Sequence, residues 1–313
     1  YLDLGESHLI TASYDSDMSL SGNNKGRRWN LTSKSVVAFY RHFKPRKEPQ
    51  CIDIASDGEF IYSGSDDGMA LRFDKRTGRI LFTYCEINAN IRKIALSEHL
   101  FALSATDGFI RVFDKVTGVV IRELFHSNNE AMDVRISKDE TRVWSCSMDG
   151  SVKCHLISTG EVLFHSKVHE DWIWSICMNN NDTVLVSGSS DGTVAFVSAE
   201  TGQLLSRLHC FPVENEFCFE CPPDKAFPNG FFYTSNKDFI EVEQIEAESG
   251  TKRILDLKDP VRISYIDRHN LRNMVITRLM NNRQYNAITE KYLNERKVLD
   301  QIRDLNLPKR LRS

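Results

Sequence analysis

Hydrophobic and polar residues alternate over short stretches along most of this chain, and small polar turns separate the stretches at regular intervals. The clearest set covers residues 173–178, 183–187, 193–197 and 203–208. Each stretch is rich in β-branched or aromatic residues, which is typical of β-strands rather than helices. The pattern therefore predicts a sheet of four short antiparallel strands, with 203–208 as its outermost strand.

The same unit recurs earlier in the chain with the same turns. Asp-Gly pairs stand at Asp67-Gly68, Asp107-Gly108, Asp149-Gly150 and Asp191-Gly192, and they are 40, 42 and 42 residues apart. A Thr-Gly turn follows each pair, with its glycine 10 residues after the first glycine. Repeats of roughly 40 to 45 residues with four strands each are the signature of a β-propeller. The predicted strands of these repeats are 51–55, 60–63, 69–73 and 79–84; 91–96, 100–103, 109–113 and 119–124; 132–136, 142–146, 152–156 and 162–165.

The two ends of the chain follow the pattern less regularly. Residues 2–4, 8–13, 25–29 and 36–41 predict a first sheet, and 231–235, 239–245 and 252–257 predict a sixth. Residues 261–266 and 273–279 are candidates for the start of a seventh, while the proline-rich stretch 212–229 is predicted to be irregular. We expect an all-β propeller of seven blades over residues 1–280, and the assignment rests mainly on residues 50–208.

A helical period replaces the strand pattern near the C-terminus. Apolar residues recur there at steps of three and four, and Pro308 ends the run. The residues on this face are Tyr285, Ile288, Tyr292, Leu299 and Ile302. We expect residues 281–313 to form an amphipathic helical tail, packed either on the propeller or on a helix of a partner.

The charge of the chain is divided unevenly. The 313 residues carry a net charge of −3, but residues 251–313 contain 15 Lys and Arg against 7 Asp and Glu, a net charge of +8. Residues 1–250 contain 25 against 36, a net charge of −11. A basic tail on an acidic body favours an acidic partner, and RNA binding within a ribonucleoprotein is one alternative function.

The repeat turns also resemble those of a known family. Ser63-Gly-Ser-Asp-Asp-Gly68 precedes Phe73-Asp74, and Ser104-Ala-Thr-Asp-Gly108 precedes Phe113-Asp114. These motifs resemble the WD-repeat family, and His169 lies shortly before Trp172, where that family often has a histidine. The eponymous tryptophan is replaced in the four regular repeats by Phe73, Phe113, His155 and Val197. The resemblance implies a non-enzymatic scaffold for protein interactions within an intracellular complex.

A second resemblance indicates a different partner. Residues 61–76 are similar to the sixteen-residue box with which some WD-repeat proteins dock on the adaptor of a cullin-ring ubiquitin ligase. Arg76 is the last residue of this box, and Phe73 stands where the box has tryptophan. An alternative function is therefore that of a substrate receptor for such a ligase, with Arg76 docking on the adaptor.

Partner binding is expected on one face of the disc. In propellers, the loop before each first strand and the hairpin between strands two and three lie on the same face. An exposed aromatic residue among polar groups there is typical of an interface hot spot. We expect a peptide or helix to bind at this face, while Trp174 packs in the core. The candidate binding residues are Glu48, Asn90, Asn129, Glu130, Asp171 and Trp172.

Catalytic and metal-binding patterns are weak in this sequence. Residues 188–192 fit Gly-x-Ser-x-Gly, but a predicted strand follows them, whereas a hydrolase nucleophile needs a strand-to-helix elbow. His209, Cys210, Cys218 and Cys221 form half of a zinc pattern, and we interpret the cysteines as core residues. We expect no enzymatic activity, no cofactor and no metal ion.

The compartment follows from the cysteines and from the hydropathy pattern. The eight cysteines are scattered and fall mainly in predicted strands, as expected for thiols in the reducing cytoplasm or nucleus. We find no apolar run of the roughly 18 residues that a membrane span requires, and we expect no membrane contact.

Overall fold

The structure is a computed structural model that describes residues 2–3, 8–12, 26–42, 51–211, 216–224, 230–236, 243–245, 252–254 and 275. It divides into two compact units, residues 1–191 with 198–203, and residues 192–197 with 204–313. In the described part of the chain, no helix is both long and apolar enough to cross a membrane.

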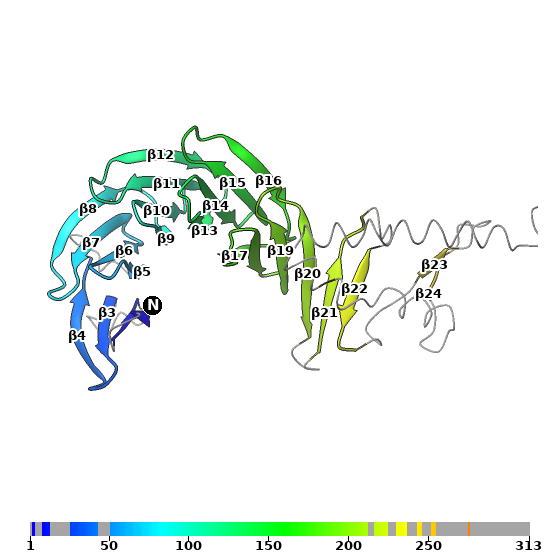
Figure 1. The fold of residues 1–313 in the computed structure, drawn as a ribbon, viewed down its shortest axis with the longest axis horizontal. Helices are drawn as coiled ribbons and strands as arrows, with labels where there is room; N and C mark the ends of the chain where they lie inside the picture. Colours follow the sequence, from blue (N-terminus) through cyan, green and yellow to red (C-terminus); the bar gives the residue numbers. More distant parts are fainter. Residues whose placement is uncertain are drawn as a thin grey trace, which may run out of the picture. The chain divides into compact units, whose positions relative to one another are not determined.

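The first unit contains four antiparallel sheets of four strands each, and within each sheet the strands follow chain order (Figure 1). The first sheet is β1 (Leu2–Asp3), β2 (His8–Thr11), β3 (Gly26–Asn30) and β4 (Ser35–Tyr40). The second is β5 (Cys51–Ser56), β6 (Phe60–Ser65), β7 (Met69–Asp74) and β8 (Ile80–Glu86). The third is β9 (Ile91–Leu96), β10 (Leu100–Ala105), β11 (Phe109–Asp114) and β12 (Val120–Phe125). The fourth is β13 (Ala131–Ile136), β14 (Arg142–Ser147), β15 (Ser151–Leu156) and β16 (Val162–Lys167).

A further hairpin in the first unit, β17 (Ile173–Met178) with β18 (Val184–Ser189), begins the fifth repeat. The predicted strands of the second to fifth repeats are thus confirmed, with ends that differ by at most three residues. Consecutive sheets touch mainly through their first strands, with β5 against β9, β9 against β13, and β13 against β17. The last strands β4, β8, β12 and β16 lie on the outer side (Figure 1). Within this unit, the arrangement is propeller-like.

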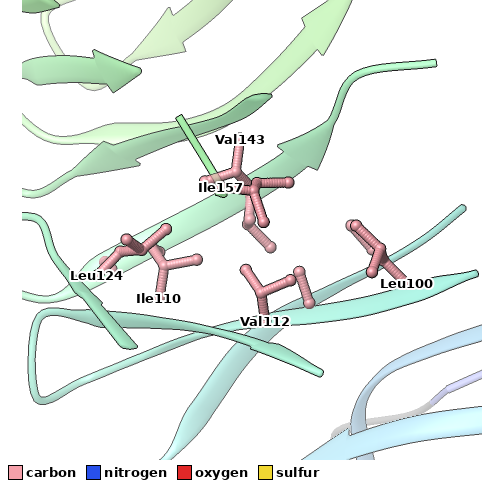
Figure 2. Packing of buried hydrophobic residues seen from close by; sticks show 10 residues of the cluster. Leu100, Ile110, Val112, Leu124, Val143 and Ile157 are labelled. Carbon is pink, nitrogen blue, oxygen red and sulfur yellow. The ribbon is translucent and has the colours of Figure 1, made fainter. Parts of the chain in front are cut away.

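Each hydrophobic core of the first unit is shared between two successive sheets. One core joins Ile10 and Tyr40 of the first sheet to Ile61 and Phe73 of the second. Another joins the third and fourth sheets (Figure 2), with Leu100, Ile110, Val112 and Leu124 facing Val143 and Ile157. A single sheet therefore buries its faces only against its neighbours.

Buried aspartates on the first strands add directional bonds between the sheets. Asp133 is fully buried on β13, and its Oδ2 accepts from the backbone N of Ile176 at 2.9 Å and from Ser175 Oγ at 2.8 Å. Asp53 on β5 accepts in the same way from the backbone N of Ile94 at 2.9 Å. These hydrogen bonds fix the position of β5 relative to β9 and of β13 relative to β17 along the strand direction.

The turns confirm the predicted role of the Asp-Gly pairs. Asp67 Oδ1 accepts from the backbone N of Met69 at 2.8 Å, and Asp149 Oδ1 accepts from the backbone N of Ser151 at 2.8 Å. Gly68, Gly108, Gly150 and Gly192 all have φ near +80°, a conformation that other L-residues rarely adopt. The turn at residues 188–192 leads directly into a strand, so the hydrolase elbow is absent there.

The second unit corrects two expectations. Its strands β19 (Thr193–Ser198), β20 (Leu204–Phe211), β21 (Glu216–Cys221) and β22 (Phe231–Thr234) are neighbours in that order. The stretch 212–229 was predicted to be irregular, and β20 was predicted to be outermost; both predictions are wrong, because β21 forms within that stretch and pairs with β20. Its prolines lie outside the strand, and Phe217 and Phe219 alternate with Cys218 and Glu220 as a strand requires.

The remaining described residues give little of the predicted sixth and seventh blades. A hairpin joins β23 (Glu243–Ile245) to β24 (Lys252–Ile254), within the predicted strands 239–245 and 252–257. The strand predicted to begin the same sheet, 231–235, is β22 and pairs with β21 instead, so its assignment to the sixth sheet is wrong. Val275, where a strand was predicted, is helical and buried. The tail residues Tyr285, Ile288, Tyr292, Leu299 and Ile302 lie outside the described residues, so the tail helix and the blade count of seven stay predictions.

The two glycines Gly108 and Gly58 provide a matched test of this turn geometry. A Cβ on Gly108 would lie 2.0 Å from the carbonyl oxygen of Ser127, whereas a Cβ on Gly58, which has φ of +96°, would meet nothing within 4 Å. We expect Gly108→Ala to lower the free energy of unfolding by about 3 kcal/mol, because a steric clash adds to the left-handed strain. Gly58→Ala should cost about 1 kcal/mol, from strain alone. Urea unfolding measures both values, and equal losses would contradict the close approach at Gly108.

Candidate functional site

The predicted binding residues lie immediately before the first strands, next to the hairpins between the second and third strands. Backbone bonds show this in three repeats, where Thr106 N donates to Asn90 O, Met148 N to Glu130 O, and Ser190 N to Trp172 O, at 2.9 to 3.1 Å. The two kinds of loop therefore share one end of the sheets, as predicted. Glu48 lies outside the described residues.

Several of these predicted residues are engaged within the protein. Glu130 Oε2 accepts from Arg92 Nε at 2.8 Å, and both side chains are half-buried. The backbone N of Asn90 donates to Thr106 Oγ1 at 3.0 Å, and that of Asn129 donates to Ser127 Oγ at 3.2 Å. Asn90 and Asn129 are exposed, so their side chains remain accessible while their backbones shape the loops.

Two tryptophans stand out at this end of the fifth repeat. Trp172 is 45% exposed and Trp174 is 51% exposed, with ring centroids 5.7 Å apart and planes at 68°. The backbone N of Trp172 donates to Asp171 Oδ1 at 2.7 Å, and Trp174 Nε1 donates to Ser190 Oγ at 2.5 Å. We call Glu170, Asp171, Trp172 and Trp174 the Trp172 rim.

The exposure of Trp174 corrects the expectation that it packs in the core. The pairing of β17 with β18 shifts register between Ile173 and Ser175, which leaves Trp174 as the extra residue of a β-bulge. A bulge interrupts the alternation of side chains along a strand, so counting by twos back from the buried Ile176 wrongly assigns Trp174 to the buried face. Sequence alternation gives no signal of the bulge.

A buried histidine network holds the loop that carries the Trp172 rim. His169 Nε2 contacts Ser187 Oγ at 2.9 Å, and His169 Nδ1 contacts Asp191 Oδ2 at 2.9 Å. The same carboxylate oxygen accepts from the backbone N of Glu170 at 3.1 Å. Asp191 therefore fixes both the imidazole and the first residue of the rim.

Equivalent networks occur in two other described repeats. His42 Nε2 contacts Ser63 Oγ at 2.6 Å with Asp67 beside its Nδ1, at 3.5 Å. His126 Nδ1 contacts Ser145 Oγ at 2.7 Å. In these repeats the histidine and serine thus remain in contact, with Asp67 and Asp149 near the imidazoles, although the family's tryptophan is replaced.

The third repeat shows what happens where the polar members are missing. Ile87 donates its backbone N to Gly68 O, as His126 does to Gly108 O, so it takes the histidine position. Leu103 lies four residues before Asp107, where the other repeats have serine. Both apolar side chains belong to the aromatic core around Phe101. In the third sheet, apolar packing of Ile87 and Leu103 therefore takes the place of the hydrogen bond between the histidine and serine side chains.

The fourth repeat also contains a cluster of two imidazoles, a hydroxyl and a carboxylate that the sequence did not predict. Ser151 Oγ donates to Asp149 Oδ1 at 2.6 Å and lies 3.0 Å from His126 Nε2 and 2.9 Å from His165 Nε2. These groups come from separate strands and loops, and only the pairing of β15 with β16 brings His165 to Asp149. No spacing in the sequence signals this arrangement.

The half of a zinc pattern does not form a single cluster. His209 Nε2 contacts Glu220 Oε2 at 3.1 Å, Cys210 is exposed, and Cys218 and Cys221 are buried. Burial raises the pKa of the Cys218 thiol to about 11, and it raises that of Cys154 to about 12. Such thiols are protonated and unreactive at neutral pH, in keeping with a core role.

Burial also keeps the histidines of the fourth repeat neutral. It lowers the pKa of His126 to about 3, with the Asp149 carboxylate opposing the shift. It lowers the pKa of His155 to about 4, and the Lys153 ammonium acts in the same direction. In the unfolded chain, both imidazoles titrate near their ordinary pKa of about 6.5.

A specific pH dependence of stability follows from these two histidines. Below about pH 6.5 the two histidines bind protons in the unfolded chain but stay neutral in the folded chain. Their contribution to the free energy of unfolding is therefore full above that pH and is lost as the pH falls. We expect the free energy of unfolding to drop by about 1.4 kcal/mol per pH unit for each histidine between about pH 6 and 5. Urea unfolding at several pH values measures the slope, and His126→Asn should reduce it. A slope that His126→Asn leaves unchanged would contradict this account.

Comparison with known proteins agrees with the repeat geometry. The family model "WD domain, G-beta repeat" matches residues 34–74 and 160–196. A WD repeat domain-containing protein 83 homolog of Dictyostelium discoideum is 22% identical over 237 residues, which cover 65% of this chain and 72% of that protein. WD repeat domain-containing protein 83 of Rattus norvegicus is 26% identical over 167 residues, 50% of this chain and 53% of that protein. The chain thus spans about half the length of the rat relative.

The fold is similar to that of a solved structure as well. A chain in the crystal structure of the mitotic checkpoint complex has a TM-score of 0.55 at 16% identity, covering 69% of this chain and 72% of that chain. At this identity the likeness concerns the fold alone. The first family match runs from β4 to the end of β7, and the second runs from β16 into β19. Because both matches fall on the strands and turns that make up the repeats, residues 34–74 and 160–196 are WD repeats, and the chain is similar to WD-repeat proteins.

Proposed function

We propose that this protein is a non-enzymatic interaction scaffold that binds a peptide or helix across the Trp172 rim. WD-repeat proteins generally act as protein-interaction scaffolds. The observation that carries the proposal is that two large aromatic side chains remain about half exposed, Trp172 on the loop held by the buried His169, Ser187 and Asp191 network and Trp174 at the start of β17. Rigid aromatic side chains at an exposed surface are typical hot spots of interfaces.

The charge of the rim favours a basic partner. Glu170 and Asp171 are exposed beside Trp172, and residues 1–250 carry a net charge of −11. A lysine or arginine side chain over an indole gains a cation–π interaction, and nearby carboxylates strengthen the attraction. We therefore infer that the bound segment places a basic side chain on Trp172.

We infer a role within an assembly, and the relatives do not identify the partner. The similar solved chain belongs to a mitotic checkpoint complex, which is a multiprotein assembly. In this chain, the buried thiols of Cys146 and Cys154 suit a reducing compartment, so we infer residence in the cytoplasm or the nucleus. The predicted tail helix would add a second contact.

Replacing Trp172 tests the proposal. We expect Trp172→Ala to weaken binding of the partner at least 30-fold, which corresponds to about 2 kcal/mol at a hot spot. The matched control is Val116→Ala, because Val116 is 70% exposed in the β11–β12 turn, at the opposite end of the sheets. Quantitative affinity purification compares the two variants, and intrinsic tryptophan fluorescence with lysine-rich and glutamate-rich peptides tests the charge preference. Equal partner recovery from both variants would exclude the Trp172 rim as the binding surface.

The adaptor-docking alternative keeps one observation in its favour. Arg76 is exposed in the turn after β7, where Asp74 Oδ1 accepts from Thr77 N at 2.7 Å and from Thr77 Oγ1 at 2.6 Å. An accessible arginine on an ordered turn suits docking onto another protein. We expect Arg76→Glu to abolish co-purification with a cullin-ring ligase adaptor if this function is correct. Unchanged adaptor recovery, with partners of the Trp172 rim retained, would remove the alternative.

A further inference from the structure

The fourth sheet differs from its sister sheet at the same structural positions. In the second sheet, His42, Ser63 and Asp67 form the buried network, and Met69 follows Asp67 by two residues. In the fourth sheet, the residue two after Asp149 is Ser151. Lys153 pairs with His165 there, where the second sheet pairs Leu71 with Thr83. The fourth sheet thus has a second imidazole and an extra hydroxyl at positions where the second sheet has a threonine and a methionine.

The added groups converge on one point. One ligand atom each from His126, Asp149 and His165 lie within 4.8 Å of one another. Ser151 Oγ sits among them, at 2.6 to 3.0 Å from all three. His126 is buried, Asp149 is half-buried and His165 is exposed, so the cluster opens to solvent on the side of β16.

We propose that His126, Asp149 and His165 bind a zinc ion. Two imidazoles and one carboxylate are a common ligand set for Zn²⁺, with bond lengths of about 2.0 to 2.2 Å and a fourth position for a water or hydroxyl oxygen. Ligand atoms around a tetrahedral zinc lie about 3.4 Å apart, so the cluster must contract by up to about 1.4 Å, and Ser151 Oγ must move from its place between the three ligand atoms. His165 can make this movement because its ring is exposed on the outermost strand.

The surroundings of His126 support this assignment. The ring nitrogen of a zinc-binding histidine that faces away from the metal is usually held by a hydrogen bond, which fixes the tautomer and the ring orientation. His126 has this arrangement, because its Nδ1 contacts Ser145 Oγ at 2.7 Å while Nε2 points to the cluster. The positively charged Lys153 also lies near His126, and its Nζ donates to the carbonyl oxygens of Phe125, at 3.3 Å, and of His126.

A bound ion would tie together three parts of the fourth repeat. His126 follows β12, Asp149 lies in the β14–β15 turn and His165 belongs to β16, which is the outermost strand of its sheet (Figure 1). The ion would stabilise the folded chain, since a ligand that binds only the folded state raises its stability. Ser151 is only 3% exposed, so the role of the site is structural rather than nucleophilic. This inference is independent of the function proposed for the Trp172 rim.

Zinc titration of the full chain tests the inference. We expect isothermal titration calorimetry at neutral pH to show a zinc-binding step that His165→Ala removes and that Ser145→Ala weakens about 10-fold or more. The matched control is His99→Ala. His99 is an exposed histidine whose Nδ1 lies 3.0 Å from the Glu140 carboxylate, and it is not part of the cluster of His126, Asp149 and His165. This control should bind zinc as the unaltered chain does.

Thermal unfolding and cobalt spectroscopy provide independent readouts. Zinc should raise the melting temperature of the unaltered chain and of His99→Ala, but not that of His165→Ala. Without metal, these three proteins should melt within a few degrees of each other, because His165 is exposed. Cobalt should give the intense absorption of a tetrahedral complex without a thiolate band. The proposal is overturned if the unaltered chain shows no zinc step, or if His165→Ala and His99→Ala bind zinc equally.

Discussion

A sheet of four short strands has two faces, and in this protein each sheet can bury them only against the sheets on either side. The hydrophobic clusters among the described residues of the first unit are shared between successive sheets. Apolar packing alone lacks direction, and the bonds from Asp53 to Ile94 and from Asp133 to Ile176 supply it. The loops extend from the ends of these strands. The positions of the side chains on the loops therefore depend on how the sheets pack against one another.

The buried histidines perform a similar task at one end of the sheets. A histidine, a serine and a turn aspartate join the loop before a first strand to the hairpin of the same repeat. Where the polar members are absent, as at Ile87 and Leu103, a purely apolar contact replaces them. The residues at these positions can therefore differ between repeats, polar in some and apolar in others, while the loop before the first strand stays in place. The Trp172 rim and the zinc site proposed for the fourth sheet both build on this shared element.

The regular repeats were predictable because their information is local. The alternation of side chains, the Asp-Gly turns and their spacing all act within about ten residues, and the strands of the second to fifth repeats appeared where these signals placed them. The strand β21 escaped prediction because the prolines beside it outweighed the alternation of Phe217 and Phe219 in our interpretation. The pre-strand positions of Asn90, Glu130 and Trp172 were also predictable, since they follow from the repeat itself.

The local signals of the chain are sufficient for its repeats, its turns and its likeness to WD repeats, because each depends on neighbouring residues. Side-chain position at the surface required the folded protein. The bulge in β17 turns Trp174 outward, and the pairing of β15 with β16 carries His165 to Asp149 and His126. Both depend on the register between strands, which packing against other sheets selects and which no spacing along the chain encodes.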